Sequence, residues 1–234
     1  MGTDIHLRLQ RRTASGWEYL PVVKPNWRHT DHASGKGVPD PRERHYDVFA
    51  FLANVRNGSG FAGVKTGEPI KPQFAGRGFP ADYDNAPDET DDGTLPDATH
   101  ATISTLRAWM GEHSLTWASV AELKAAPWDT GFNSCGVIGE KDYKSRIAAG
   151  VTGPPESWCG DVWGPDLVTI EASDYAATRH TVHASVPESK CHVRVYWRWQ
   201  PLTKSGFKRW LDTLTEESLG VDLSDARVIM GFDS

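Results

Sequence analysis

The two ends of this 234-residue chain carry the patterns that most constrain its fold, because both indicate β-strands. Residues 4–10 alternate, with three aliphatic side chains on one side and polar side chains on the other, which is typical of a half-buried strand. Residues 227–232 predict a closing strand, and residues 192–200 predict the strongest strand of the chain. Helical patterns stand between them. We therefore expect an α+β fold with a mixed or antiparallel sheet that joins the N- and C-terminal strands.

A central buried helix is expected between residues 41 and 56. Asp40 is suited to the N-cap, Pro41 to the first helical position, and Glu43 to closing a capping box. Apolar residues cover most of the circumference of this helix, so it should be buried on nearly all sides. The helix is expected to stop at Asn57 and the glycine that follows it.

Several shorter elements are expected to pack around this helix. They are a strand at 17–23, helices at 100–111, from Ser119 to Pro127 and at 204–219, a helical turn at 140–148, and strands at 167–170 and 181–186. We expect one α+β domain over residues 1–234. Residues 83–97 are rich in acidic side chains and predict a mobile insertion in that domain.

Composition excludes some function classes. The net charge of −6 argues against a general nucleic-acid binder, although a few arginines could still hold a small anionic ligand. No apolar run is long enough for a transmembrane helix, so no membrane association is expected. The three cysteines are widely spaced and favour free thiols in a reducing cytoplasm. Ten tryptophans could fill a core or, where exposed, could bind a flat ring or a peptide.

Asp4 and His6 form the first candidate site, because they project from the same face of the predicted N-terminal strand. They could be two ligands of a divalent metal, or a catalytic base with the acid that orients it. They could equally make structural hydrogen bonds at the edge of the sheet. The cofactor is therefore unknown, and a divalent metal is possible.

Two arginine-containing segments are candidates for binding an anion. Arg56 and Asn57 follow the predicted central helix, where they could cap it or could present a guanidinium to a ligand. Arg77 and Asp82 lie in a segment whose glycine and proline fix the backbone. They could bridge one another and pin the loop, or Arg77 could bind a phosphate or carboxylate.

His113 and Ser114 form a further candidate, in which Ser114 is a local cap or the histidine is an acid or base acting on a bound anion. The common serine hydrolase, P-loop, zincin and EF-hand motifs are not found in the sequence. One face of the strand at 192–200 is polar and could be solvent-exposed or functional. It carries His192, Arg194, Tyr196 and Arg198.

Six stretches together resemble a known family. They are Met1-Gly2-Thr3-Asp4-Ile5-His6, residues 46–57 (YDVFAFLANVRN), 60–63 (GFAG), 77–82 (RGFPAD), 113–123 (HSLTWASVAEL) and 227–233 (RVIMGFD). In this order they resemble uncharacterised bacteriophage and bacterial proteins that begin Met-Gly-(Cys/Thr)-Asp-Ile-His. The resemblance covers residues 1–123 and the last ten residues. Glu112 departs from the Asp usual in the family, and the stretch between Asp82 and His113 is longer than usual. The resemblance implies a phage setting, and hence the host cytoplasm, without an established activity.

Three functions follow as hypotheses. The first is a small phosphate- or nucleotide-like ligand site, with Asp4, His6 and His113 as catalytic groups. Its binding groups would be Arg56, Asn57, Arg77, Asp82 and Ser114. The second is a binding or inhibitory protein that sequesters a host signalling nucleotide or blocks a host defence protein. The third is a metal-dependent hydrolase. The partner is accordingly a small anionic ligand or a host protein, and enzymatic activity is left open.

Overall fold

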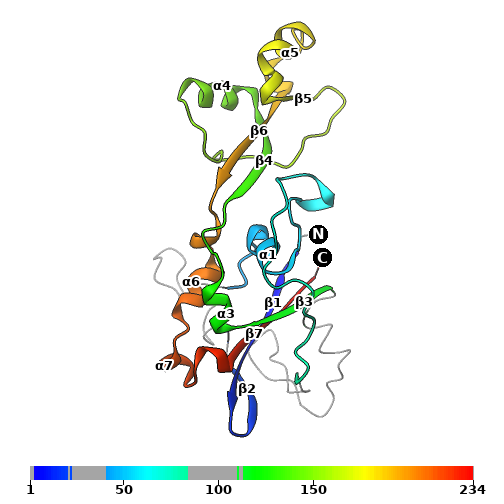
Figure 1. Ribbon diagram of the computed structural model, residues 1–234. Coiled ribbons are helices and arrows are strands. Elements are labelled where there is room, and N and C mark those ends of the chain that lie inside the picture. The colour runs from blue at the N-terminus through cyan, green and yellow to red at the C-terminus, as the bar shows by residue number, and fades with distance from the viewer. Residues whose placement is uncertain (1–2, 21, 23–40, 84–109, 111–112, 234) are drawn as a thin grey trace, which may run out of the picture. The chain divides into compact units, whose positions relative to one another are not determined.

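The structure is a computed structural model that describes residues 3–20, 22, 41–83, 110 and 113–233 (Figure 1). Its internal contacts group the chain into two compact units, where the sequence predicts a single domain. Unit 1 comprises Met1–Val55, Lys71–Asp129 and Leu202–Ser234, and unit 2 comprises Arg56–Ile70 and Thr130–Pro201. Apart from Tyr83 and Met110, the predicted acidic insertion and the predicted helix at 100–111 lie outside the described residues.

Unit 1 contains a four-stranded antiparallel sheet in the order β2-β1-β7-β3. Its strands are β1 (Ile5–Thr13), β2 (Gly16–Leu20), β7 (Ala226–Phe232) and β3 (His113–Ser119). The first and last strands of the chain pair directly, with Ile5 opposite Phe232. This pairing confirms the predicted α+β class and the predicted sheet that joins the two termini.

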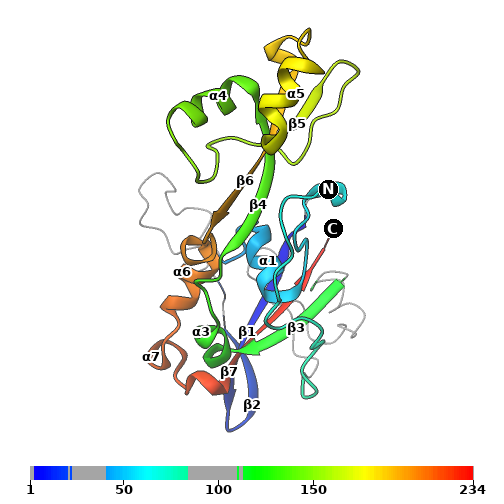
Figure 2. The same ribbon diagram turned by 45° about the horizontal axis from the view of Figure 1, so that its top comes forward.

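The helix α1 (Tyr46–Ala53) lies against the sheet of unit 1 (Figure 2). Six of its eight residues are buried, which confirms the expected central buried helix. The ring of Phe49 meets the ring of Phe232 on β7 edge to face, with 5.3 Å between the centroids. Burial of such aromatic side chains is among the largest contributions to the stability of a core.

Both ends of α1 differ from the prediction. His45 is the N-cap, while Asp40 lies outside the described residues. The carboxylate of Glu43 accepts a hydrogen bond from the backbone N–H of Gly206 at 3.1 Å, so it satisfies the start of another helix. Asn54 takes the left-handed conformation (φ 66°) that ends α1, three residues before the predicted stop.

Among its described residues, unit 1 has three further α-helices. The capping box of Ser119 and Glu122 opens α3 (Val120–Ala125), within the range from Ser119 to Pro127 in which the sequence predicts a helix. The predicted helix at 204–219 is instead two helices, α6 (Gly206–Thr213) and α7 (Glu216–Leu219). A second capping box at Thr215 restarts the helix after an extended residue, and Gly220 (φ 71°) ends it as predicted.

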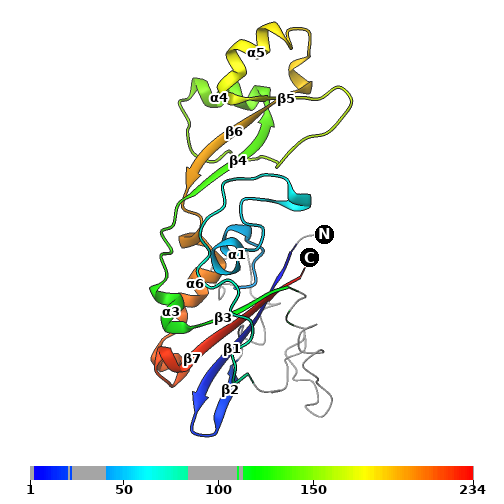
Figure 3. The same cartoon turned by 45° about the vertical axis from the view of Figure 1, so that its right-hand side comes forward.

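Unit 2 contains a three-stranded sheet in the order β4-β6-β5 (Figure 3). Its elements are β4 (Phe132–Gly139), α4 (Glu140–Ala148), β5 (Val168–Glu171), α5 (Tyr175–Thr181) and β6 (Cys191–Trp199). The strands β4 and β6 are antiparallel, whereas β5 runs parallel to β6. Strand β6, strand β5 and the helical turn at 140–148 were predicted. The strand predicted at 181–186 is wrong, because α5 occupies the start of that range and turns follow it.

One side of the unit 2 sheet forms its core, which centres on Ile138, Val193, Val195 and Trp197. Trp158 packs on this side, where Gly136 leaves room for it: a Cβ at Gly136 would lie 2.4 Å from the Trp158 ring. The opposite side of this sheet is polar.

The described residues also form five short 3-10 helices. They are η3 (Phe61–Gly63), η4 (Ala172–Asp174), η5 (Glu188–Lys190), η6 (Leu202–Lys204) and η7 (Leu223–Asp225). In the described part of the chain, every helix is too short or too polar to cross a bilayer.

Candidate functional site

Asp4 and His6 contact other residues of unit 1. The Asp4 carboxylate receives three contacts of 2.6–2.8 Å from the Arg44 guanidinium. His6 Nε2 lies 3.1 Å from the carboxylate of Asp233, which also accepts the backbone N–H of Asp4 at 2.9 Å. Burial alone would raise the pKa of Asp233, but these hydrogen bonds hold it below its ordinary value. The backbone of Asp4 and the ring of His6 thus both join the N-terminal strand to Asp233 near the C-terminus.

His113 lies on the opposite face of the sheet from His6. His113 pairs with Phe232 and His6 pairs with Gly231, the preceding residue of β7. Because successive residues of a strand point to opposite faces, the two histidines do not project towards a common site. The His113 ring stacks on Phe232 at 6.4 Å, and its Nδ1 lies 3.0 Å from the Ser114 hydroxyl. Ser114 has a positive φ of 56° at a bulge in β3.

Arg77 anchors its loop to α3. Its guanidinium contacts the carboxylate of Glu122 at 3.0 Å and donates to the Trp117 carbonyl at 3.2 Å. It also lies over the rings of Phe74 and Trp117, at 4.9 and 5.7 Å from their centroids. Because Glu122 also closes the capping box of α3, this arginine stabilises the junction between its loop and that helix.

Asp82 pairs with Arg227 of β7, and the Arg77–Asp82 bridge considered from the sequence does not form. Its carboxylate accepts hydrogen bonds from Arg227 and, at 2.7 Å, from the Trp17 indole. Arg227 is buried, donates to Gln10 at 2.8 Å and lies 3.7 Å from the centroid of the Trp17 ring. The hydrogen bond from Arg227 lowers the pKa of Asp82. This cluster fixes the loop to the face of the sheet opposite the one that packs on α1.

Arg56 and Asn57 belong to unit 2, whereas the candidates near the N-terminus, on β3 and in the loop at 77–82 belong to unit 1. Arg56 donates to the Gly60 carbonyl at 2.9 Å. The Asn57 side chain makes two hydrogen bonds with the backbone of Ile70, at 2.7 and 2.8 Å, and so closes the loop between them. These contacts give both residues a structural role.

A metal site also fails to form from the described groups. Across residues 3–20, 22, 41–83, 110 and 113–233, no cluster of three or more His, Cys, Asp or Glu side chains is arranged to hold an ion. Asp4 and His6, the proposed metal ligands, are held by Arg44 and Asp233 instead.

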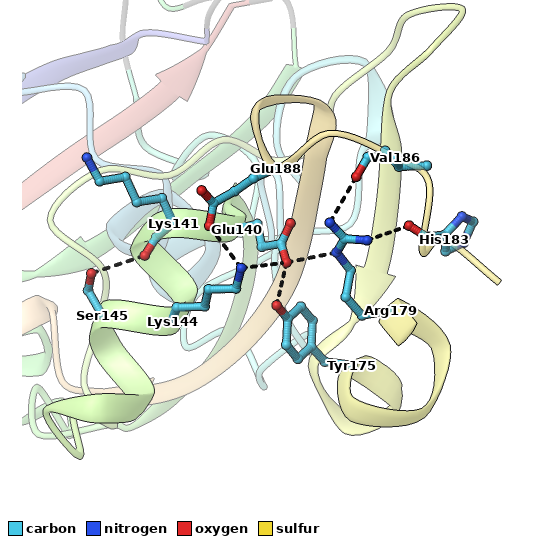
Figure 4. A network of polar contacts seen from close by, with 9 residues as sticks. All are labelled: Glu140, Lys141, Lys144, Ser145, Tyr175, Arg179, His183, Val186 and Glu188. Carbon is cyan, nitrogen blue, oxygen red and sulfur yellow. Dashed lines mark hydrogen bonds and ion pairs between the residues drawn. The ribbon is translucent and has the colours of Figure 1, made fainter. Parts of the chain in front are cut away.

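Unit 2 contains a buried ionic network that the sequence did not predict (Figure 4). Glu140, at the start of α4, is 1% exposed and accepts from Arg179 at 2.8 Å and from the Tyr175 hydroxyl at 2.5 Å. Lys144 bridges Glu140 and Glu188, at 3.1 and 2.9 Å. Burial opposes ionisation of Glu140, yet the donors, Arg179 foremost, lower its pKa to about 2.

The remaining contacts of this network are also structural. Arg179 donates to the carbonyl oxygens of His183 and Val186, so it ties the turn after α5 to α4 (Figure 4). Burial and the adjacent Glu140 raise the pKa of Tyr175 to about 12. The network therefore holds α4, α5 and this turn together, with its carboxylate ionised and its phenol neutral at neutral pH.

The polar side of the unit 2 sheet is closed at one end. We call it the polar face: His192, Arg194, Tyr196 and Arg198 of β6, with Asn133 and Cys135 of β4 opposite Arg198 and Tyr196. At the closed end, Arg194 donates to the Gly160 carbonyl at 3.1 Å and pairs with Asp161 at 3.2 Å and Glu171 at 3.5 Å. Arg194 is thus neutralised and mostly buried.

The other end of the polar face is open and hollowed. A cavity of about 250 Å³ lies there, lined by Gly67, Glu68, Asn133, Ser134, Cys135, Tyr196 and Trp197. Tyr196 is 58% exposed, and its hydroxyl donates to Glu171 at 2.8 Å. Arg198 stands opposite Asn133, and neither side chain has a hydrogen-bond partner among the described residues. This end combines an exposed ring with unused donors.

The thiol and the phenol at the open end are neutral donors near pH 7. Burial raises the pKa of the Cys135 thiol, and the hydrogen bond to Glu171 raises the pKa of the Tyr196 phenol. Neither group is therefore prepared to act as a nucleophile or base at neutral pH. The arrangement is suited to binding.

Sequence reasoning identified Tyr196 and Arg198 but missed the β4 residues beside them. Strand β4 is hard to recognise because Ser134 and Gly136, on its core side, are small. The tryptophan that packs on Gly136 comes from a loop more than twenty residues later, so the local pattern contains no sign of it. Comparisons of the chain with models of known protein families, with curated proteins and with solved structures give no match.

Proposed function

We propose that this protein binds a small anionic ligand that contains a planar ring, such as a nucleotide, at the open end of the polar face. The observation that carries the proposal is the position of two unused donors, Arg198 and Asn133, beside an exposed tyrosine ring and a cavity. A guanidinium binds phosphate oxygens in a fork geometry. An exposed tyrosine on a sheet face offers a stacking surface for a base.

The phage setting that the family resemblance implies is part of this proposal. A phage protein that binds a host nucleotide without turning it over would act by sequestration. The neutral thiol and phenol at the open end support binding over catalysis. The candidate residues of unit 1 support it as well, because each already has a protein partner in the described structure.

The test is a calorimetric titration of the purified chain with AMP, GMP, CMP and UMP. The nucleoside and ribose 5-phosphate are titrated alongside the monophosphate that binds best. We expect the monophosphate to bind at least about tenfold more tightly than either fragment, because each fragment lacks one of the two contacts. In Arg198→Ala the monophosphate should bind no more tightly than the nucleoside. In Tyr196→Ala the monophosphate should bind no more tightly than ribose 5-phosphate. Tyr196→Phe keeps the ring and should retain the tighter binding of the monophosphate.

Arg12→Ala is the matched control, because Arg12 is also an exposed strand arginine but lies in unit 1. It should leave all affinities unchanged. Failure of all four monophosphates to bind, or equal losses in Arg12→Ala and Arg198→Ala, would refute the proposal.

Binding of a host protein is a second candidate, and the distribution of exposed apolar side chains favours it. Among the described residues, all the large exposed ones lie in unit 2: Ile147, Val151, Trp158, Trp163, Leu167, Val182 and Tyr196. Trp163 is 73% exposed. Trp163→Ser should weaken retention of a host protein on the immobilised chain while leaving nucleotide titrations unchanged. Equal retention by both forms would count against this candidate.

A further inference from the structure

A second cavity lies on the core side of the unit 2 sheet, between α4 and residues 151–157. We call it the α4 groove; its volume is about 590 Å³, and its lining includes Ile138, Asp142, Arg146, Val151, Pro154 and Glu156. Small-molecule sites commonly enclose roughly 300–1,000 Å³, so the groove is of ligand size. Ile138 and Cys135 point to opposite faces of β4, so the groove and the polar face are separate sites.

The walls of the α4 groove are fixed by hydrogen bonds within the protein. Arg146 donates to the carbonyl oxygens of Gly153 and Pro154, and the Val151 N–H donates to the Arg146 carbonyl at 3.0 Å. Pro154 and Pro155 restrict the backbone of the facing wall. A groove held in this way needs little rearrangement to accept a ligand.

One stripe of α4 forms the other wall. Asp142, Ser145, Arg146 and Ala149 have the spacing i, i+3, i+4 and i+7, which places them on one side of the helix. The charge of Arg146 is directed to backbone carbonyls. The remaining charged groups of the lining are thus the carboxylates of Asp142 and Glu156, and neither has a hydrogen-bond or ion-pair partner among the described residues.

We propose that the α4 groove binds a small organic cation with an apolar body, whose charge lies between Asp142 and Glu156. Ile138 is buried at 4% exposure, whereas Val151 is 46% exposed, so apolar surface continues from the core into the groove. A ligand that covers Val151 removes this surface from water. The two carboxylates then select a cation over a neutral or anionic analogue of the same shape.

The test compares hexylammonium, hexanol and hexanoate, which differ mainly in the charge of the head group. Each is titrated at millimolar concentration into the full-length, isotope-labelled chain, and amide chemical shifts are followed by NMR. We expect hexylammonium to bind about fivefold more tightly than hexanol, and hexanoate to bind least. The shifts should concentrate at residues 138–157.

Asp142→Asn with Glu156→Gln is the decisive variant, because it removes both charges and keeps the shape of the groove. In this variant hexylammonium should bind no more tightly than hexanol, whose own affinity should be unchanged. Asp174→Asn is the matched control, since Asp174 is an exposed acid of unit 2 outside the groove, and it should preserve the preference for the cation.

Three outcomes would overturn the proposal. They are no binding by any of the three probes, equal affinity for all three in the wild-type chain, and a preference for the cation that survives the double substitution. Shifts confined to residues outside 138–157 would place any binding elsewhere and would equally overturn it.

Discussion

Replacing Glu140 with glutamine should weaken unit 2 more than any loss of a surface ion pair. Glu140 is 1% exposed, and one of its carboxylate oxygens faces Arg179, Tyr175 and Lys144. Its pKa falls from an ordinary value of 4.5 to about 2 in the folded protein. A shift of one unit in pKa corresponds to about 1.4 kcal/mol, so the ionised carboxylate contributes about 3 kcal/mol to the free energy of unfolding. Removing one member of a buried ion pair has a cost of about this size.

The location of the effect follows from the contacts of Arg179. Arg179 joins Glu140 to the carbonyl oxygens of His183 and Val186. The loss of stability in Glu140→Gln should therefore concentrate at residues 175–187. Hydrogen exchange followed by mass spectrometry resolves that segment, and we expect its protection to fall by about 3 kcal/mol in Glu140→Gln. Glu68→Gln, which breaks an exposed pair with Lys65, is the control and should leave protection unchanged.

The pH dependence provides an independent check of the Glu140 prediction. The carboxylate has a lower pKa in the folded than in the unfolded chain, so its contribution is complete above about pH 4.5 and is lost as the pH falls towards 2. The difference in stability between the wild-type chain and Glu140→Gln should therefore shrink over this range. A difference that stays constant with pH, or one no larger than that of Glu68→Gln, would refute the reasoning.

Three further substitutions test the fold. Gly231→Ala should lower the stability of unit 1 by about 3 kcal/mol in denaturant titrations, because its Cβ would lie 1.6 Å from the Met110 carbonyl oxygen. Asn57→Ala should lower the protection of residues 57–70 against hydrogen exchange by about 1–3 kcal/mol. Asn57→Asp keeps the acceptor for the Ile70 N–H, so its protection should fall by less. Arg227→Lys should lower the melting temperature, since an ammonium cannot reproduce the stacked, forked contacts of this buried guanidinium. Wild-type behaviour in any of these variants would contradict the corresponding contact.

The fold could be predicted where local pattern and long-range packing agree. The alternation of β1 and β6 and the capping box of Ser119 and Glu122 each have a local cause, and each is found in the structure. Glu43 shows the limit of this reasoning. Its spacing from Asp40 suits a capping box, yet its carboxylate accepts from Gly206, more than 160 residues along the chain. Sequence spacing carries no information about that partner.

The candidate site was harder to predict because charged residues that were expected to bind a ligand form structural ion pairs with residues distant in the sequence. Arg77 meets Glu122 and Asp82 meets Arg227, so each half of the RGFPAD segment pairs with a separate element of unit 1. Such pairs join segments that the sequence places far apart. By contrast, Arg198 was recognised from the alternation of β6 alone, because a strand's period assigns its faces without reference to any partner.

The division of the chain into two units relates these observations to function. The stretches on which the family resemblance rests lie mostly in unit 1, and there the polar side chains of the N-terminal, loop and C-terminal motifs join strands and loops to one another. Unit 2 comes mainly from residues that the resemblance does not cover. It holds the polar-face cavity and the α4 groove, the unused donors of the polar face and the large exposed apolar side chains of the described chain. Ligand binding requires polar and apolar groups that are not already engaged in contacts within the protein. We therefore expect the residues that determine ligand specificity to lie in unit 2.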